Sequence, residues 1–106
     1  MIEKRRIAVE EKQNIEWKAA WKDEYLQWIC GFANANGGSL YIGVDDNGQV
    51  IGVANAKRLL EDLPNKIRDT MGIVADINLL KEQEKEYIEI TVPSYPVAIS
   101  CKGAYY

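Results

Sequence analysis

Acidic and lysine side chains occur in two short stretches that could together support metal-dependent chemistry. Glu16 and Lys18 alternate with Trp17 in a strand-like run, so their side chains should share one face, about 7 Å apart from twice a rise of about 3.4 Å. Glu11 precedes this run, and Asp45-Asp46 comes later in a turn. Carboxylates can hold a divalent cation, and a neighbouring lysine can stabilise an attacking water or a developing phosphate charge. These residue types are a minimum set for phosphodiester cleavage without histidine.

The same residues also have a structural interpretation, which spacing alone favours. Glu16 and Lys18 can form an exposed ion pair, and Asp45-Asp46 can be turn residues that precede Asn47-Gly48. The sequence contains no histidine, which removes Ser-His and Cys-His nucleophile pairs and zinc sites that use imidazole. Any chemistry must therefore use carboxylates, lysine or a hard metal ion. Mg²⁺ or Mn²⁺ would suit such a site, although no cofactor is fixed by spacing alone.

Basic and aromatic residues form a second candidate set near the N-terminus. Residues 1–22 hold six Lys or Arg against four Glu, whereas residues 23–106 hold seven against twelve acids. Lysine and arginine contact phosphates, and exposed aromatic rings stack on unpaired bases. The net charge of −3 argues against non-specific coating of nucleic acid, so such a surface would be a local patch. Its candidate members are Lys4, Arg5, Arg6, Lys12, Lys18, Lys22 and Trp21.

The segment 32–53 should position these residues. Asn36-Gly37-Gly38 follows an apolar helical run and predicts a helix stop, because glycine readily adopts the left-handed conformation. Residues 39–46 and 49–55 are strand-like, and Asn47-Gly48 between them predicts a two-residue hairpin turn. This register pairs Val44 with Ile51, and Gly43 with Gly52 at a bare spot that another backbone can approach. The apolar face of the predicted hairpin consists of Leu40, Ile42, Val44, Ile51 and Val53.

The flanking segments predict helices and further strands. Residues 15–19 alternate like a short strand, with Trp17 expected in the core. Residues 24–35 predict a buried helix with Asp23 as its N-cap, and residues 57–71 predict a helix that Pro64 should kink or split and Gly72 should end. Residues 76–82 and 86–92 predict strands joined by a charged turn, the second with one solvated face, and residues 97–101 begin another strand. The apolar positions of the first helix are Tyr25, Leu26, Trp28, Ile29, Phe32 and Ala33.

Length and composition indicate one globular domain over residues 1–106, with 47% hydrophobic and 27% charged residues. No apolar run approaches the about 20 residues of a membrane helix, and the start lacks a secretory signal, so a soluble, cytoplasmic protein is expected. Cys30 and Cys101 are expected to be buried, reduced thiols. Because the chain stops at Tyr105-Tyr106 within an aromatic strand-like run, we expect an N-terminal fragment of a longer protein.

These residues resemble the Schlafen AlbA-like domain, a family usually described as DNA-binding. The likeness runs from about Glu11 to Tyr106, with Val92-Pro93 and a Gly-x-Tyr-Tyr near the end. Trp17 stands where the family usually has phenylalanine, which is a change of volume in the core. The motifs that carry the likeness are Glu11-x-x-x-x-Glu16-Trp17-Lys18 and Phe32-Ala33-Asn34-x-x-Gly37-Gly38-x-Leu40-x-Ile42-Gly43-Val44-Asp45-Asp46-x-Gly48-x-Val50-x-Gly52-Val53.

The resemblance implies an α/β (α+β) domain with a mixed, largely antiparallel sheet and flanking helices, typically at the start of regulators or helicase-related proteins. In animal Schlafens a related, duplicated domain cleaves RNA with three carboxylates. By motif these map onto Glu11, Glu16 and Asp46 as catalytic metal ligands, with Lys18 assisting. Simple alternation would turn Asp46 towards the apolar face, so Asp45 is its stand-in. A groove made by two copies would require a homodimer.

Three functions therefore follow as hypotheses. The leading one is a nucleic-acid-binding domain of a transcriptional-regulator-like protein, with DNA or RNA as partner and no membrane. The second is a divalent-metal-dependent, Schlafen-like ribonuclease. The third is a protein-interaction module, which would suit the acidic remainder of the chain.

Overall fold

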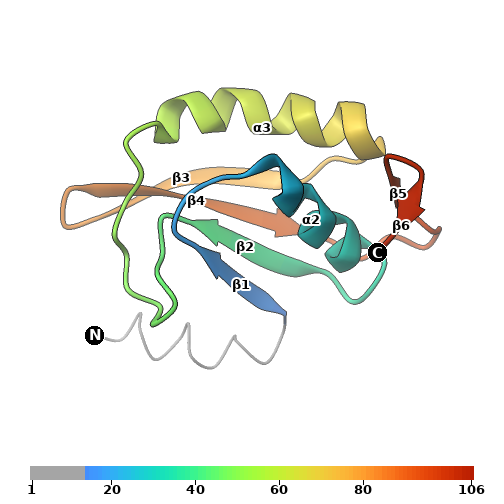
Figure 1. Ribbon diagram of the computed structural model, residues 1–106, viewed down its shortest axis with the longest axis horizontal. Helices are drawn as coiled ribbons and strands as arrows, with labels where there is room; N and C mark the ends of the chain where they lie inside the picture. The colour runs from blue at the N-terminus through green and yellow to red at the C-terminus, as the bar shows by residue number, and fades with distance from the viewer. Residues whose placement is uncertain (1–13) are drawn as a thin grey trace.

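The computed structural model describes residues 14–106, where a four-stranded mixed sheet is the central element (Figure 1). β1 (Ile15–Lys18) runs parallel to β2 (Gly38–Ile42), and β4 (Lys85–Val92) pairs antiparallel with both β2 and β3 (Asp76–Glu82). The strand order is β1-β2-β4-β3, so β2 and β4 each have neighbours on both edges. This is the mixed, largely antiparallel sheet with flanking helices that was predicted.

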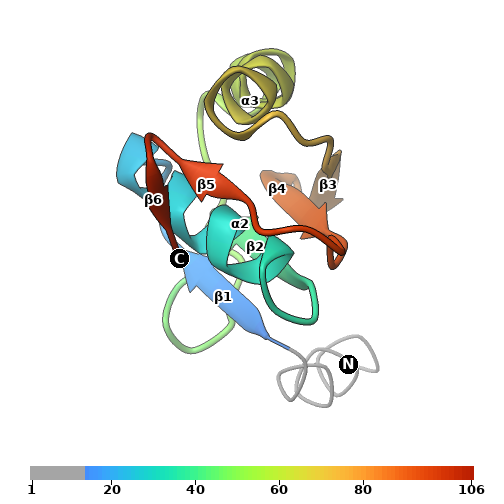
Figure 2. The same ribbon diagram turned by 90° about the vertical axis from the view of Figure 1, so that its right-hand side faces the viewer.

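The connections between these strands carry the helices. The 3₁₀ turn η2 (Asp23–Tyr25) and α2 (Leu26–Ala33) form the crossover from β1 to β2, as parallel strands require. α3 (Ala56–Met71) lies between β2 and β3 in the chain. The short strands β5 (Ser100–Cys101) and β6 (Ala104–Tyr105) pair as a small hairpin that lies beside α2 (Figure 2). No helix within residues 14–106 is long and apolar enough to cross a membrane.

α2 and α3 cover the same face of the sheet. β2 contributes Leu40 and Ile42 to this layer, and β4 contributes Ile88, Ile90 and Val92, all essentially inaccessible to solvent. Alternate β4 residues lie on the other face and are more exposed, which confirms the predicted alternation of that strand. The helices complete the core with Leu26, Ile29, Cys30 and Ala33 from α2 and Leu59, Leu63 and Ile67 from α3, each set at helical spacing.

The opposite face of the sheet holds a smaller cluster and a polar row. Trp17, Tyr41 and Glu89 are consecutive partners across β1, β2 and β4. The Tyr41 hydroxyl donates to Oε2 of Glu89 at 3.0 Å, and the Asn78 amide donates to Oε1 at 3.2 Å. Tyr41 also packs with Val44 and Val50, against which Ile15, Trp17 and Tyr87 are half-buried. Trp17 is therefore partly buried against this smaller cluster, and it is not in the main core where it was expected.

The predicted hairpin around Asn47-Gly48 is wrong. Residues 49–55 form no strand, and the contact beyond β2 is an isolated bridge between Val44 and Val50 instead of a ladder with Val44 opposite Ile51. The reason lies in the sheet order, because β1 and β4 already occupy both edges of β2. Gly43, with φ of 101°, also changes the alternation, so Val44 joins Tyr41 on the opposite face and Ile51 is exposed.

Several local predictions also needed correction. Asp23 does not cap a helix that starts at residue 24, because the first turn is 3₁₀ and no side-chain cap bond forms there. Pro64 does not split α3, because the helix runs from Ala56 to Met71 with Pro64 exposed inside it. The last predicted strand shrinks to Ser100–Cys101. Trp28 was assigned to the buried face, yet it is 42% exposed.

Other local predictions are confirmed. Gly37 has φ of 85° and donates its N–H to the Phe32 carbonyl at 2.9 Å, which closes α2 as a glycine stop. Gly72 ends α3 with φ of 74°. Gly43 and Gly52 do approach each other, because the Gly43 carbonyl accepts the Gly52 N–H at 2.9 Å. A Cβ on Gly43 would lie 2.9 Å from Cβ of Tyr87, so β4 is the backbone that fills this bare spot.

Candidate nucleic-acid interface

Glu16 and Lys18 lie together on the edge strand β1, as their alternation predicted. The Lys18 ammonium is 3.3 Å from Oε2 of Glu16, and about a quarter of each side chain is exposed. Their strand partners are Leu40 and Ile42, which face the helix-covered core. The pair is thus half-buried at the rim of the apolar layer, and not an exposed surface pair. Inward-pointing charge on an edge strand discourages edge-to-edge pairing, which gives the pair a structural role as well.

Lys18 also contacts the aromatic side chains at the start of α2. Its ammonium is 4.8 Å from the ring centroid of Tyr25 and 5.4 Å from that of Trp28. We call Lys18, Tyr25 and Trp28 the lysine–aromatic surface. Such cation–π contacts contribute about 0.5–1 kcal/mol at exposed sites. The surface places a cation beside an indole that is 42% exposed, a combination that can contact a phosphate and stack on a base.

The turn that contains Asp45 and Asp46, which we call the acidic turn, begins where β1 ends. The Lys18 carbonyl accepts the N–H groups of Gly43 and Val44, at 2.7 and 3.2 Å, because β1 and β2 are parallel and finish at the same end of the sheet. A Cβ on Gly48 would lie 2.9 Å from Cη2 of Trp17, so the turn also folds back onto β1. The first strand and this turn are therefore adjacent in space.

The two acids of the turn have different environments. Asp45 is half-buried, and its carboxylate accepts the N–H groups of Asn47 and Gln49, both at 2.9 Å. Its carbonyl accepts the Gly48 N–H at 2.9 Å, so Asp45 opens a four-residue turn. Asp46 is exposed. Asp45 therefore has a structural role, and Asp46 remains the acid predicted for the site.

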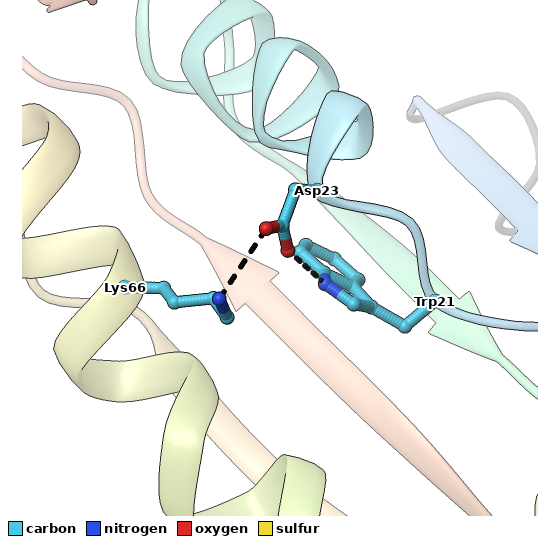
Figure 3. Close-up of polar contacts among 3 residues, drawn as sticks. All are labelled: Trp21, Asp23 and Lys66. Carbon is cyan, nitrogen blue, oxygen red and sulfur yellow. Dashed lines mark hydrogen bonds and ion pairs between the residues drawn. The ribbon is translucent and has the colours of Figure 1, made fainter.

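Trp21, which was predicted to contact nucleic acid, belongs to a tether between the β1–α2 connection and α3 (Figure 3). Its indole N–H donates to Oδ1 of Asp23 at 2.7 Å, and the Lys66 ammonium donates to Oδ2 of Asp23 at 3.3 Å. The hydrogen bond from Trp21, with the bond and charge of Lys66, lowers the pKa of Asp23 below its ordinary value of 3.8. Trp21 also packs edge-on against Tyr25, with ring centroids 6.0 Å apart.

A shallow apolar hollow of about 460 Å³ adjoins the lysine–aromatic surface. Trp28 and Gly31 of α2 line one side, and Tyr106 lines the other. Asn34 holds these sides together, because its amide nitrogen donates to the carbonyls of Ile99 at 2.7 Å and Tyr106 at 3.1 Å. Its amide oxygen accepts the Ile99 N–H at 2.6 Å. One side chain therefore fixes the C-terminal hairpin against α2.

The two cysteines, Cys30 in α2 and Cys101 in β5, are free and buried, as predicted. The Cys30 thiol donates to the Ile99 carbonyl at 3.2 Å. Burial, with a smaller contribution from Cys30, raises the pKa of the Cys101 thiol. Both thiols therefore belong to the packing of α2 against the hairpin.

Of the remaining predicted site residues, Lys22 is the one that lies within the described residues 14–106. Lys22 is exposed at the start of η2. Within residues 14–106, no three acidic or cysteine side chains gather closely enough to hold a metal ion. Lys4, Arg5, Arg6, Glu11 and Lys12 lie outside the described residues.

Sequence reasoning did not identify the residues that form and order the hollow, which are Trp28, Asn34 and Tyr106. A signal for Trp28 was present, because Leu26, Ile29, Cys30 and Ala33 already form a complete apolar stripe at i, i+3, i+4 and i+7. Trp28 is off that stripe. Asn34 follows the last residue of α2, but its partners are 65 and 72 residues away, beyond any local pattern.

Comparisons with known proteins identify the fold and the family of this chain. The DIP2311 protein of Corynebacterium diphtheriae has a similar fold over 87% of this chain, with a TM-score of 0.71 and 18% identity, but this chain spans only 20% of that protein. The N-terminal domain of a protein from Nitrosomonas europaea, named as related to the ATP-dependent DNA helicase RecG, matches over 88% of this chain and 72% of its own length, with a TM-score of 0.64 and 18% identity. A search of curated proteins finds no significant relative. The model of the family described as "Schlafen, AlbA_2" matches residues 11–106, and the chain therefore belongs to the Schlafen AlbA_2 family.

Proposed function

We propose that this chain is a nucleic-acid-binding domain and that its lysine–aromatic surface contacts the nucleic acid. The observation that carries the proposal is the Lys18 ammonium 5.4 Å from the ring of Trp28, which is 42% exposed. A cation for the phosphate and an open ring for a base then stand side by side. Membership of the AlbA_2 family supports this function, and the RecG-related neighbour is named after a DNA helicase.

The overall charge of the chain restricts the interface to this region. The net charge is −3, so residues distant from Lys18 repel a polyanion more than they attract it. Lys22 and the basic residues Lys4, Arg5, Arg6 and Lys12 would extend the contact along the N-terminal part of the chain. We place the domain in a transcriptional-regulator-like protein of the cytoplasm, where Cys30 and Cys101 remain reduced.

Substitutions of Lys18 and Glu16 should change the affinity for nucleic acid in opposite directions. Lys18→Gln removes the cation, so affinity for labelled DNA and RNA should fall, and the slope of log K against log salt should decrease by about 0.7–0.9. Glu16→Gln releases Lys18 from its partner, so affinity should rise. Fluorescence anisotropy between about 50 and 200 mM salt measures both changes. Lys57→Gln is the matched control, because Lys57 is exposed on α3.

If both variants leave affinity unchanged, the lysine–aromatic surface is not the interface. If the wild-type protein binds neither DNA nor RNA at low salt, a protein-interaction module becomes the better interpretation. Circular dichroism of each variant separates loss of binding from loss of folding, because Glu16 and Lys18 are half-buried.

A metal-dependent nuclease is the second candidate, since the acidic turn adjoins Lys18 at the end of β1, two residues after Glu16. The acids of residues 14–106 do not suffice for a metal ion, so this function also requires Glu11 beside Glu16 and Asp46. Incubation of labelled RNA and DNA with Mg²⁺ or Mn²⁺ tests it. Cleavage that Glu16→Gln abolishes would establish the nuclease, whereas binding without cleavage would leave the first proposal standing. Sedimentation of the complex would show whether two copies bind together.

A further inference from the structure

We propose that the hollow between α2 and Tyr106 receives one unstacked base, so that the domain prefers single-stranded nucleic acid. This inference rests on the proposed function and names its substrate class. The hollow has about 460 Å³, within the range of about 300–1,000 Å³ typical of ligand sites. Its lining is mainly apolar, which suits the face of a nucleobase.

Two aromatic side chains form walls of the hollow. Trp28 is 42% exposed and Tyr106 is 47% exposed, and both line the hollow. Gly31 lies between them on α2. A Cβ placed on Gly31 would lie 3.9–4.0 Å from the Tyr106 backbone and Cβ, so the absence of a side chain at Gly31 lets Tyr106 pack closely against α2. A base paired within a duplex cannot enter such a hollow, whereas an unpaired base can.

The walls are held in place before any ligand binds. Asn34 bonds to Ile99 through both of its amide atoms, and it also donates to the Tyr106 carbonyl. These bonds join the end of α2 to the residues on both sides of the β5–β6 hairpin. Tyr106 is thereby positioned relative to Trp28, and less ordering is needed when a base binds.

The cation and the hollow share one side chain. Trp28 lines the hollow, and Lys18 lies 5.4 Å from the centroid of the same indole. Because a nucleotide carries its phosphate next to its base, one nucleotide can engage both. Gln27 also lines the hollow, and its amide group can bond to the edge of a base.

The experiment compares three fluorescent probes of equal length at about 50 mM salt: an oligothymidine, the same strand with abasic sites, and a duplex. The abasic strand keeps the phosphates and lacks the bases. We expect the oligothymidine to bind most tightly, and Trp28→Ala and Tyr106→Ala each to weaken it about tenfold. The affinity of the abasic strand should not change in these variants.

Two further variants control for folding and position. Tyr105→Ala removes the neighbouring exposed tyrosine, which does not line the hollow, and should bind as the wild type does. Gly31→Leu keeps both aromatic side chains and places a larger side chain against the Tyr106 backbone and Cβ, which narrows the hollow from the α2 side. Leucine also favours a helix more than glycine does. This variant should remain folded and bind the oligothymidine about as weakly as Trp28→Ala.

Each outcome has a distinct meaning. If the abasic strand or the duplex binds as tightly as the oligothymidine, or if Gly31→Leu binds normally, the base site is refuted while nucleic-acid binding stands. If no probe binds, the proposed function and the base site both fail. Weakening by Lys18→Gln alone would show phosphate contact without base insertion.

Discussion

The chain reversals at residues 44–50 and 82–85 are held in different ways. In the first, the Asp45 carboxylate accepts two backbone N–H groups, and the chain crosses to Val50 through a single bridge. In the second, Gln83 and Glu84 both adopt positive φ, 51° and 69°, and join two paired strands. The first contains Asn-Gly, the dipeptide that most favours a hairpin, and the second does not.

This difference shows that a free strand edge decides whether a turn becomes a hairpin. β4 pairs with β2 on one edge and leaves the other edge to β3, so the chain can fold back at residues 83–84 and continue the sheet. β2 has β1 on one edge and β4 on the other, so residues 49–55 have no ladder to join. A local turn signal therefore competes with partners that arrive from distant parts of the sequence.

The largest effect is expected from Gly43→Ala. Gly43 has φ of 101°, and its new Cβ would lie 2.9 Å from Cβ of Tyr87 and 3.2 Å from the Gly52 backbone. Strain and overlap together should lower the free energy of unfolding by about 3 kcal/mol, measured by urea denaturation. Gly103→Ala is the control, because its φ is 83° but its Cβ would meet nothing within 4 Å, and it should lose only about 1 kcal/mol. Equal losses would show that packing at Gly43 does not matter.

A smaller loss is expected from Asp45→Ala. The substitution leaves the N–H groups of Asn47 and Gln49 without their carboxylate acceptor, which should lower the free energy of unfolding by about 1–2 kcal/mol. Asp46→Ala removes an exposed neighbouring carboxylate and should leave stability within about 0.5 kcal/mol. If Asp46→Ala were the more destabilising variant, the assignment of Asp45 to structure and Asp46 to the site would be reversed.

The second reversal should respond in the opposite direction. Replacing Gln83-Glu84 by Asn-Gly supplies residues that tolerate positive φ, so the free energy of unfolding should rise by about 1 kcal/mol. Thermal and urea denaturation measure this gain. An unchanged or reduced stability would mean that the original side chains contribute to the turn more than its backbone strain costs.

The smallest effect on stability is expected at acid pH from Asp23, which lies in the connection between β1 and α2. Trp21 and Lys66 lower the pKa of Asp23, so its stabilising contribution is complete above about 3.8 and is lost as the pH falls through the lower pKa of the folded state. The Asp23 side chain is 58% exposed, so the contribution is modest. Asp23→Asn should therefore lower Tm slightly at pH 6, and the Tm of this variant should fall less than that of the wild type between pH 6 and pH 2. If the Tm values of the two proteins fell in parallel with pH, the contribution of the Asp23 contacts would be contradicted.

The sequence was most informative where a residue's role depends on its own element. The alternation of Ile88, Ile90 and Val92 and the spacing of Leu59, Leu63 and Ile67 identified strand and helix faces that the structure confirms. The pairing of Glu16 with Lys18 also followed from alternation along one strand. In each case the periodicity of a single element fixes which side chains are neighbours.

The sequence was least informative where a role depends on the order of strands. Both edges of β2 are paired, with β1 and with β4, and Gly43 interrupts the alternation of the strand. Val44 therefore lies on the face of the sheet that holds Tyr41, opposite to the predicted one. The same order placed Glu16 and Lys18 at the rim of the core, because their partners are Leu40 and Ile42. Tyr106 is held against α2 by Asn34, whose contacts span 65 and 72 residues of the chain.

The buried thiols of Cys30 in α2 and Cys101 in β5 can report local opening of this part of the molecule. Cys30 is held against the Ile99 carbonyl, and Cys101 ionises reluctantly because it is buried. Because both thiols are buried, a thiol reagent reacts with them only when this part of the structure opens. The rate of alkylation therefore measures how often the packing between α2 and the β5–β6 hairpin opens, without a reporter group introduced by mutation.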